Sequence, residues 1–310
     1  MVKSEQFPPD LGLSAEFIRN VEGSFPTGKA WLEMLPVSLA EAARRWGLLP
    51  GEPFLLSYNY VCAATRMDGT ELVLKLGVPN RELTSEINTL RLYAGQGACR
   101  LLEADAEKGM LLLERLRPGS MLASLEDDDR ATAIAADVMK NIHQPLPHQA
   151  GFLSLRGWFD ELKNLRPRFG GGTGPFPQKT FETAEGLILD LFAEDRPQVL
   201  LHGDFHHFNI LCSERGWLVI DPKGVAGPEE YEVGPLLMNP NNVILEEKEA
   251  IRRTRRRIAI LSERLGFDPQ RQRAWAICQS VLSLYWDLAE DGSGGEGARA
   301  WTEIFIKTKV

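Results

Sequence analysis

The spacing of apolar residues along the chain changes once, near Arg117-Pro118-Gly119. Before this point, short apolar runs rich in β-branched and aromatic residues prevail, which is typical of strands. After it, apolar residues recur every three or four positions, which indicates amphipathic helices. We therefore expect an α+β molecule in two parts, with a sheet-containing part at 1–116 and a mostly helical part at 117–310.

The N-terminal part is predicted to begin with a helical segment at about 12–47, interrupted at Pro36 and stopped by Gly47. A hairpin-turn signal, Asp68-Gly69, separates the first two strand-like runs. The predicted strands are 54–66, 71–78, 100–106 and 110–116, and one helix is predicted at 81–93.

The C-terminal part is predicted to be helical almost throughout. Its predicted helices are about 130–144, 154–168, 178–194, 246–266 and 270–290. The exception is 199–223, where two short apolar strands flank a polar loop. Because a polar loop held between apolar strands is well placed for chemistry, this segment is the first candidate for an active site.

The polar loop reads LLHGDFHHFNIL at 200–211, and the apolar run after it ends in Ile220-Asp221-Pro222. Phosphoryl transfer needs a carboxylate that accepts the proton of the attacking hydroxyl, and oxygen ligands for Mg²⁺. A kinase catalytic loop supplies them as His-x-Asp, then Asn five residues after the Asp, then a second Asp at the next strand end. Asp204, Asn209 and Asp221 keep this order and spacing.

Two other interpretations of this segment stay open. The polar residues could be turn formers in a hydrophilic loop. Alternatively, a zinc site could be formed by His202, His206, His207 and Cys212.

Lys75 lies inside an apolar run, where a charge needs a partner because desolvation of an ammonium group is costly. Glu86 on the following helix is the expected partner, with Glu82 one turn earlier in reserve. Such a lysine would bind nucleotide phosphates, although an edge-strand lysine facing water is the alternative. The 110–116 strand would then lead to a hinge where the backbone of Glu114 and Leu116 meets the base edge of adenine.

Composition is that of an ordinary globular protein of 310 residues, 44% hydrophobic and 25% charged. The net charge of −8 argues against a nucleic-acid partner and suits a cationic substrate. No stretch approaches 18 apolar residues, and no secretion signal is visible, so we expect a cytoplasmic protein without a membrane contact. The four cysteines are far apart, which fits a reducing compartment.

Two charged clusters in the C-terminal part have competing explanations. The arginines within 252–257 follow Glu246, Glu247 and Glu249, and we interpret them as the solvated face of a helix with i,i+4 pairs. An acidic group near the chain's end could bind a substrate amine or guanidinium, or could be a solvated helix end. The candidate substrate residues are Asp287, Glu290, Asp291 and Glu230.

Three segments together resemble the aminoglycoside phosphotransferase superfamily, and within it the streptomycin 6-kinase and hydroxyurea phosphotransferase branch. They are HGDFHHFNIL at 202–211, RGWLVIDPKG at 215–224 and the stretch 277–291. The resemblance runs from about residue 30 to 292. It implies a two-lobed protein-kinase-like fold, with a small antiparallel-sheet lobe that binds nucleotide and a larger helical lobe for catalysis and substrate. It also implies ATP or GTP with Mg²⁺, a hydroxyl of an antibiotic or sugar as acceptor, and a role in antibiotic resistance.

The resemblance also implies residue roles. Asp204 is the base, Asn209 and Asp221 hold Mg²⁺, and Lys75 with Glu86 orders the nucleotide phosphates.

Two segments depart from protein kinases. LSYNY at 56–60 replaces the glycine-rich loop, so the backbone of Ser57 and Asn59 is the expected phosphate contact. DPKG at 221–224 replaces Asp-Phe-Gly, and this leaves the role of Lys223 open.

The leading function is therefore a small-molecule kinase acting on streptomycin, a related aminoglycoside or hydroxyurea. A kinase of an unrelated small metabolite or sugar is the alternative. A catalytically inactive kinase-like binding protein and a metal-dependent phosphohydrolase are weaker candidates. A protein kinase is disfavoured, because about ten residues between Asp221 and the helix expected near Tyr231 leave little room for a peptide-binding segment.

Overall fold

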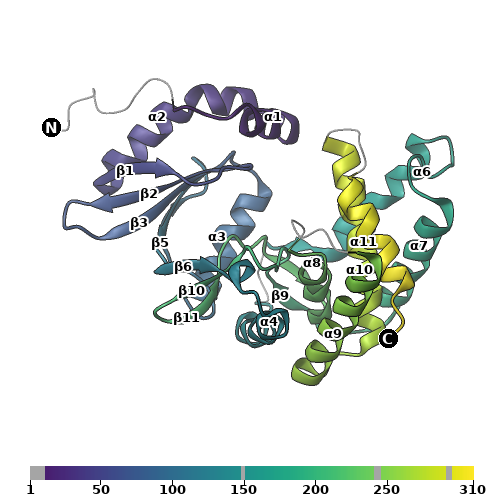
Figure 1. Ribbon diagram of the computed structural model, residues 1–310. Helices are drawn as coiled ribbons and strands as arrows, with labels where there is room; N and C mark the ends of the chain where they lie inside the picture. Colours follow the sequence, from purple (N-terminus) through teal and green to yellow (C-terminus); the bar gives the residue numbers. More distant parts are fainter. Residues whose placement is uncertain (1–10, 148–150, 241–245, 291–294) are drawn as a thin grey trace. The chain divides into compact units, whose positions relative to one another are not determined.

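The computed structural model describes residues 11–147, 151–240, 246–290 and 295–310, except for the side chains of Ala289, Glu290 and Glu296. The chain forms two compact units, and many of their elements are labelled in Figure 1. The first unit consists of Met1–Gly95 and Cys99–Leu116, and the second of Gln96–Ala98 and Arg117–Val310.

The first unit contains one antiparallel sheet with the strand order β1-β2-β3-β5-β4. Its elements are α1 (Ala15–Ser24), α2 (Gly28–Trp46), β1 (Leu48–Pro53), β2 (Tyr60–Arg66), β3 (Glu71–Leu76), α3 (Arg81–Tyr93), β4 (Leu101–Asp105) and β5 (Met110–Glu114).

Alternation along β3 assigns its residues to the two faces of this sheet. Leu72 and Leu74 join a core formed with Phe17 and Leu35 of the two N-terminal helices. Lys75 points to the opposite face, where its ammonium group contacts α3. The apolar run around Lys75 therefore belongs to a central strand, because β3 pairs with both β2 and β5.

Two predicted boundaries in this unit are wrong. The helical segment breaks at 25–27 and continues through Pro36, because α2 buries Trp31, Leu35 and Leu39 along one face. This burial outweighs the hydrogen bond that proline removes. The strand predicted at 54–66 begins at Tyr60, and an additional strand, β1, precedes it.

The second unit is mostly helical, with two small sheets of three and four strands. Its strands are β6 (Pro118–Met121), β7 (Gln144–Pro145), β8 (Leu153–Ser154), β9 (Val199–Leu201), β10 (Ile210–Ser213), β11 (Gly216–Val219) and β12 (Val225–Gly227). Its helices are η1 (Leu122–Ser124), α4 (Asp128–Ile142), α5 (Leu155–Asp160), η2 (Glu161–Asn164), α6 (Leu165–Arg168), α7 (Gln178–Ala193), η3 (Glu229–Glu232), α8 (Val233–Leu237), α9 (Glu247–Leu265), α10 (Pro269–Glu290) and α11 (Glu296–Lys307).

The core of the second unit surrounds helix α10, which packs against α7, α8 and α11. Trp275 on this helix is fully buried and forms ring contacts with Phe159, Phe192 and Tyr231. Tyr231 immediately precedes Glu232, which contacts the catalytic loop. The aromatic core thus fixes the elements that carry the candidate active site.

The expectation of a fully solvated arginine face on α9 is wrong. Arg257 is 2% exposed and binds Asp128 of α4 at 2.5 Å, and Arg253 binds the same carboxylate at 2.7 Å. Arg252 forms a local pair with Glu249, at a spacing of three residues rather than the expected four. Arg253 and Arg257 therefore join helices α9 and α4.

Within the described ranges, no helix is both long and apolar enough to cross a membrane.

Candidate active site

The candidate catalytic loop connects β9 to β10, and His202 at its start is fully buried. The backbone N–H of Asp204 donates to Nδ1 of His202 at 3.2 Å, and Nε2 lies 2.9 Å from the carbonyl of Ile220. A donor at Nδ1 leaves the ring proton on Nε2. Burial lowers the pKa of His202 to about 4, so the ring is neutral and structural.

Asp204 and Asn209 meet in this loop. The Asn209 amide donates to the backbone carbonyl of Asp204 at 3.0 Å and to its carboxylate at 3.3 Å. His206 lies 3.3 Å from the other carboxylate oxygen. Burial alone would raise the pKa of Asp204, but His206, Lys223 and His202 together lower it below its usual range. The carboxylate is therefore ionised at neutral pH, as a proton acceptor must be.

Gly203 and Glu232 hold the backbone beside Asp204. Gly203 has φ of +86°, and a Cβ there would lie 2.7 Å from Val225 and 3.2 Å from the Trp158 ring. The Glu232 carboxylate accepts hydrogen bonds from the backbone N–H groups of His202 and Gly203. Burial raises the pKa of Glu232 to about 8, and the charge of Asp204 adds to this effect.

Asp221 and Lys223 follow β11 on the other side of His202. Asp221 has φ of +57°, a left-handed backbone conformation that costs energy for any residue other than glycine. The N–H of Lys223 donates to the His202 carbonyl at 2.7 Å, which ties the two loops together. The Lys223 ammonium is close enough to lower the pKa of Asp204. Its charge thus acts on the candidate base.

The donor set suits Mg²⁺ rather than Zn²⁺. The Asn209 amide nitrogen is turned toward Asp204, so its amide oxygen is the atom available to a metal, and Asp221 adds a carboxylate. Mg²⁺ prefers such oxygen ligands and often takes only one or two carboxylates from the protein. Both ring nitrogens of His202 are engaged by the backbone, which argues against zinc. Among the described residues, no three His, Cys, Asp or Glu side chains form a metal-ligand group.

In the first unit, Lys75 lies beside Glu86. The ammonium nitrogen is 2.7 Å and 2.8 Å from the two carboxylate oxygens, and the Lys75 residue is 3% exposed. Glu86 is thus the partner chosen by geometry, ahead of the reserve Glu82. Helix α3 places it there because Asn80 caps the helix start through the N–H of Leu83.

The backbone groups expected to contact the nucleotide are partly used within the unit. The Ser57 carbonyl accepts from the Asn20 side chain at 3.3 Å, and the Asn59 side chain lies against Gly77. The N–H of Glu114 donates to the Arg100 carbonyl. The N–H of Glu114 is thus already used, and contact with the adenine base is left to other backbone atoms of Glu114 and to the backbone of the buried Leu116.

The candidate substrate residues differ in their surroundings. Glu230 is buried and pairs with Arg271 at 3.1 Å, which favours a structural role. Asp287 is half-buried near Gly295. Asp291 and the side chain of Glu290 lie outside the described residues.

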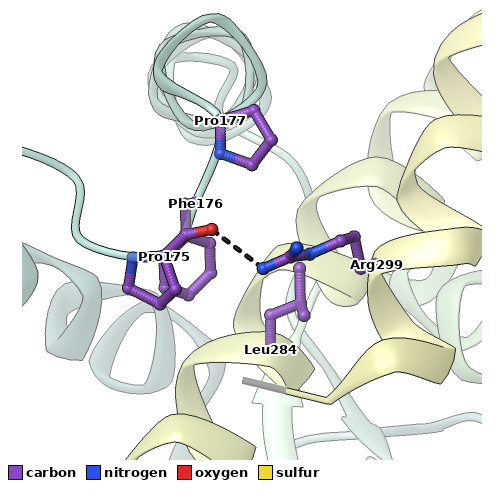
Figure 2. Close-up of a pocket in the computed structure, with 5 residues that line it drawn as sticks. All are labelled: Pro175, Phe176, Pro177, Leu284 and Arg299. Carbon is purple, nitrogen blue, oxygen red and sulfur yellow. Dashed lines mark hydrogen bonds between the residues drawn. The ribbon is translucent and has the colours of Figure 1, made fainter. Parts of the chain in front are cut away.

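A small pocket elsewhere in the unit contains none of the predicted catalytic residues. It is lined by Pro175, Phe176, Pro177, Leu284 and Arg299, and Arg299 donates to the Pro175 carbonyl at 2.9 Å (Figure 2).

Two residues at this site were not predicted. Glu232 directly precedes the apolar run 233–237 that forms the buried helix α8, and this apolar run was the signal in the sequence for a buried carboxylate. Trp158 gave no signal, because its approach to Gly203 joins distant parts of the sequence.

Comparison with known proteins identifies the family of this chain. Residues 46–292 match the model of the aminoglycoside/hydroxyurea antibiotic resistance kinases. The chain belongs to this family. Streptomycin 6-kinase of Streptomyces glaucescens is 33% identical over 273 residues, covering 86% of this chain and 87% of that protein. Hydroxyurea phosphotransferase of Kitasatospora aureofaciens is 33% identical over 270 residues, covering 86% and 76%.

A solved structure supports the fold of this member of the family. It is a thermostable mutant of aminoglycoside phosphotransferase APH(4)-Ia in a ternary complex with ADP and hygromycin B. The TM-score is 0.59 at 16% identity, with 86% of this chain and 97% of that chain covered. The predicted family, and the α+β kinase-like fold, are confirmed.

Proposed function

We propose that this protein transfers the γ-phosphate of ATP or GTP to a hydroxyl of a small molecule in a Mg²⁺-dependent reaction. Streptomycin or a related aminoglycoside is the first candidate acceptor, and hydroxyurea the second, because relatives of both activities match most of the chain. The observation that carries the proposal is the Asp204 carboxylate, which accepts a hydrogen bond from the Asn209 amide at 3.3 Å.

In this mechanism, Asp204 accepts a hydrogen bond from the acceptor hydroxyl and aligns it for in-line attack. As the hydroxyl oxygen bonds to the γ-phosphorus, the bond from phosphorus to the bridging oxygen of the nucleoside diphosphate breaks. The hydroxyl proton passes to Asp204.

Two lysines supply positive charge that balances the negative charge of the phosphates. Lys75, held by Glu86, supplies a fixed positive charge, and Lys223 adds another beside Asp204. Asn209 and Asp221 would hold Mg²⁺, which would supply further positive charge to neutralise the phosphates. Ser57, Asn59, Glu114 and Leu116 are the remaining backbone candidates for nucleotide contact.

The test is nucleotide consumption by the purified protein with Mg²⁺ and a panel of acceptors. The panel contains streptomycin, other aminoglycosides, hydroxyurea, and simple sugars and amino sugars, with the Asp204→Ala variant as blank. We expect one class of acceptor to stimulate consumption and to gain one phosphoryl group by mass. Phosphate release without an acceptor, or transfer to proteins but to no small hydroxyl compound, would contradict the proposal.

A further inference from the structure

Two half-buried tryptophans pack together in the second unit, and one of them lies against the catalytic loop. The ring of Trp158, on α5, lies against Gly203, the residue before Asp204. Trp286, on α10, meets Trp158 edge to face, with ring centroids 5.4 Å apart and planes at 88°. Helices distant in sequence therefore join to place an aromatic surface next to the candidate base.

A carboxylate is attached to this surface. Glu161 of η2 accepts a hydrogen bond from the indole N–H of Trp286 at 3.1 Å. Glu161 is exposed, whereas the neighbouring core aromatics Phe159, Tyr231 and Trp275 are almost wholly buried. Trp158 rests on this core through an edge-to-face contact with Tyr231, with ring centroids 6.4 Å apart, while both indoles keep part of their surface exposed.

The chemistry of the three groups selects a planar cation. The face of an indole attracts positive charge, and the carboxylate adds a charged acceptor. A guanidinium group can stack on the ring and donate to the carboxylate at once, whereas an ammonium group makes a compact point contact. A neutral ligand would use neither the ring electrostatics nor the carboxylate charge.

We propose that Trp158, Trp286 and Glu161 form a subsite that binds a guanidinium group of the acceptor. The subsite rests on the proposed kinase function, and it deepens that function by holding the acceptor so that a hydroxyl reaches Asp204. Trp158 contacts the catalytic loop directly, so it also links acceptor binding to the position of the base.

The experiment uses Trp286→Leu and Glu161→Gln in the full chain, because Trp158 supports the loop and its replacement could unfold it. The probes are streptomycin, which carries guanidinium groups, and hydroxyurea, which carries none. Binding is measured by titration calorimetry, and turnover by acceptor-dependent nucleotide consumption.

The control variants are matched in type and lie away from the loop. Trp301→Leu removes a half-buried indole that stacks on Phe305, and Glu182→Gln removes an exposed carboxylate that accepts from Gln178. Thermal unfolding of every variant checks that it is folded.

We expect each test variant to raise the Kd and KM for streptomycin about tenfold. The KM for nucleotide, and the kcat and KM measured with hydroxyurea, should stay within about twofold, because hydroxyurea has no guanidinium group for the subsite. Glu161→Asp should recover part of the loss. Controls should behave as wild type.

Three results would overturn the subsite. These are unchanged streptomycin Kd and KM in both variants, equal losses for hydroxyurea or in the controls, and wild-type protein that phosphorylates hydroxyurea but does not bind streptomycin. If no acceptor is phosphorylated, the proposed function fails, and the calorimetric Kd still decides the subsite.

Discussion

Gly203, in the catalytic loop, has less room for a side chain than Gly216, in the hairpin that follows the loop. It combines φ of +86° with close neighbours on β12 and α5. We predict that Gly203→Ala lowers the free energy of unfolding by about 2–5 kcal/mol, from left-handed strain and overpacking together. Activity should fall as well, because relief of the clash displaces Asp204. Chemical denaturation measures the first effect and turnover the second.

Gly216 provides the matched control for this substitution. It also has a positive φ, +99°, but a Cβ there meets no atom within 4 Å. Gly216→Ala should therefore lose only the strain contribution, about 1–2 kcal/mol, with turnover unchanged. Equal losses at both glycines would show that packing around Gly203 is not the cause.

The buried Glu232 gives the protein a pH dependence. Its pKa rises from 4.5 to about 8 on folding, so the folded protein binds the proton more tightly than the unfolded chain. Its contribution to stability is therefore full below about pH 4.5 and is lost as the pH rises through 8. Relative to Glu232→Gln, which keeps a hydrogen-bond acceptor, the wild type should lose unfolding free energy across this interval. Parallel pH profiles of the two proteins would contradict the assignment.

At the residue scale, the contacts that the sequence predicted are those between residues close to each other along the chain. The spacing of Asp204 and Asn209 is local, and their side chains meet through a five-residue loop. Helix periodicity also identified Glu86 opposite Lys75. The Glu232 contact joins residues 30 apart, and no local pattern encodes it.

At the scale of elements, helices α4 and α9 are joined by ion pairs of unequal burial. Arg257 is 2% exposed and binds Asp128, whereas the neighbouring Arg256–Asp129 pair is solvent-exposed. We predict that Arg257→Met lowers the free energy of unfolding by about 3 kcal/mol, because it leaves a partly buried carboxylate with fewer donors. Arg253 still binds Asp128, which keeps the loss at the lower end of the usual range.

Arg256→Met is the control for this prediction. Exposed pairs contribute little, so its effect should stay below about 1 kcal/mol. Denaturant unfolding of both variants makes the comparison. Similar losses would mean that burial does not distinguish the two pairs.

The prediction of elements failed where tertiary burial opposed a local signal. Pro36 is a helix breaker, yet α2 continues through it because its apolar face covers the sheet. The arginines of α9 follow a run of glutamates, yet most of their ion pairs join carboxylates on α4 about 125 residues earlier. Helix α3 was predicted with its observed bounds from the spacing of its apolar residues, and the structure adds the Asn80 cap at its start.

At the scale of the whole molecule, nucleotide and Mg²⁺ should act together on stability. A ligand that binds only the folded state stabilises it by about 2.7 kcal/mol at a hundred times its Kd. We predict that Mg²⁺ with ATP raises the unfolding midpoint more than ATP alone. This additional rise should be lost in Asn209→Ala and Asp221→Ala.

Asp190→Ala, which removes an exposed carboxylate on α7, should keep the additional rise. Excess chelator should remove it from the wild type. A Mg²⁺ effect that survives in both site variants would rule out Asn209 and Asp221 as the metal ligands.

The role of Asp204 as the base of a phosphoryl transfer is tested by comparing two proteins. Turnover with the best acceptor and the affinity for nucleotide are measured for wild type and Asp204→Ala. We expect turnover to be nearly abolished in Asp204→Ala, while its nucleotide affinity stays within about threefold of wild type, because the base contacts the acceptor hydroxyl and not the nucleotide. An Asp204→Ala protein that keeps turnover within about tenfold of wild type would show that Asp204 is not the base.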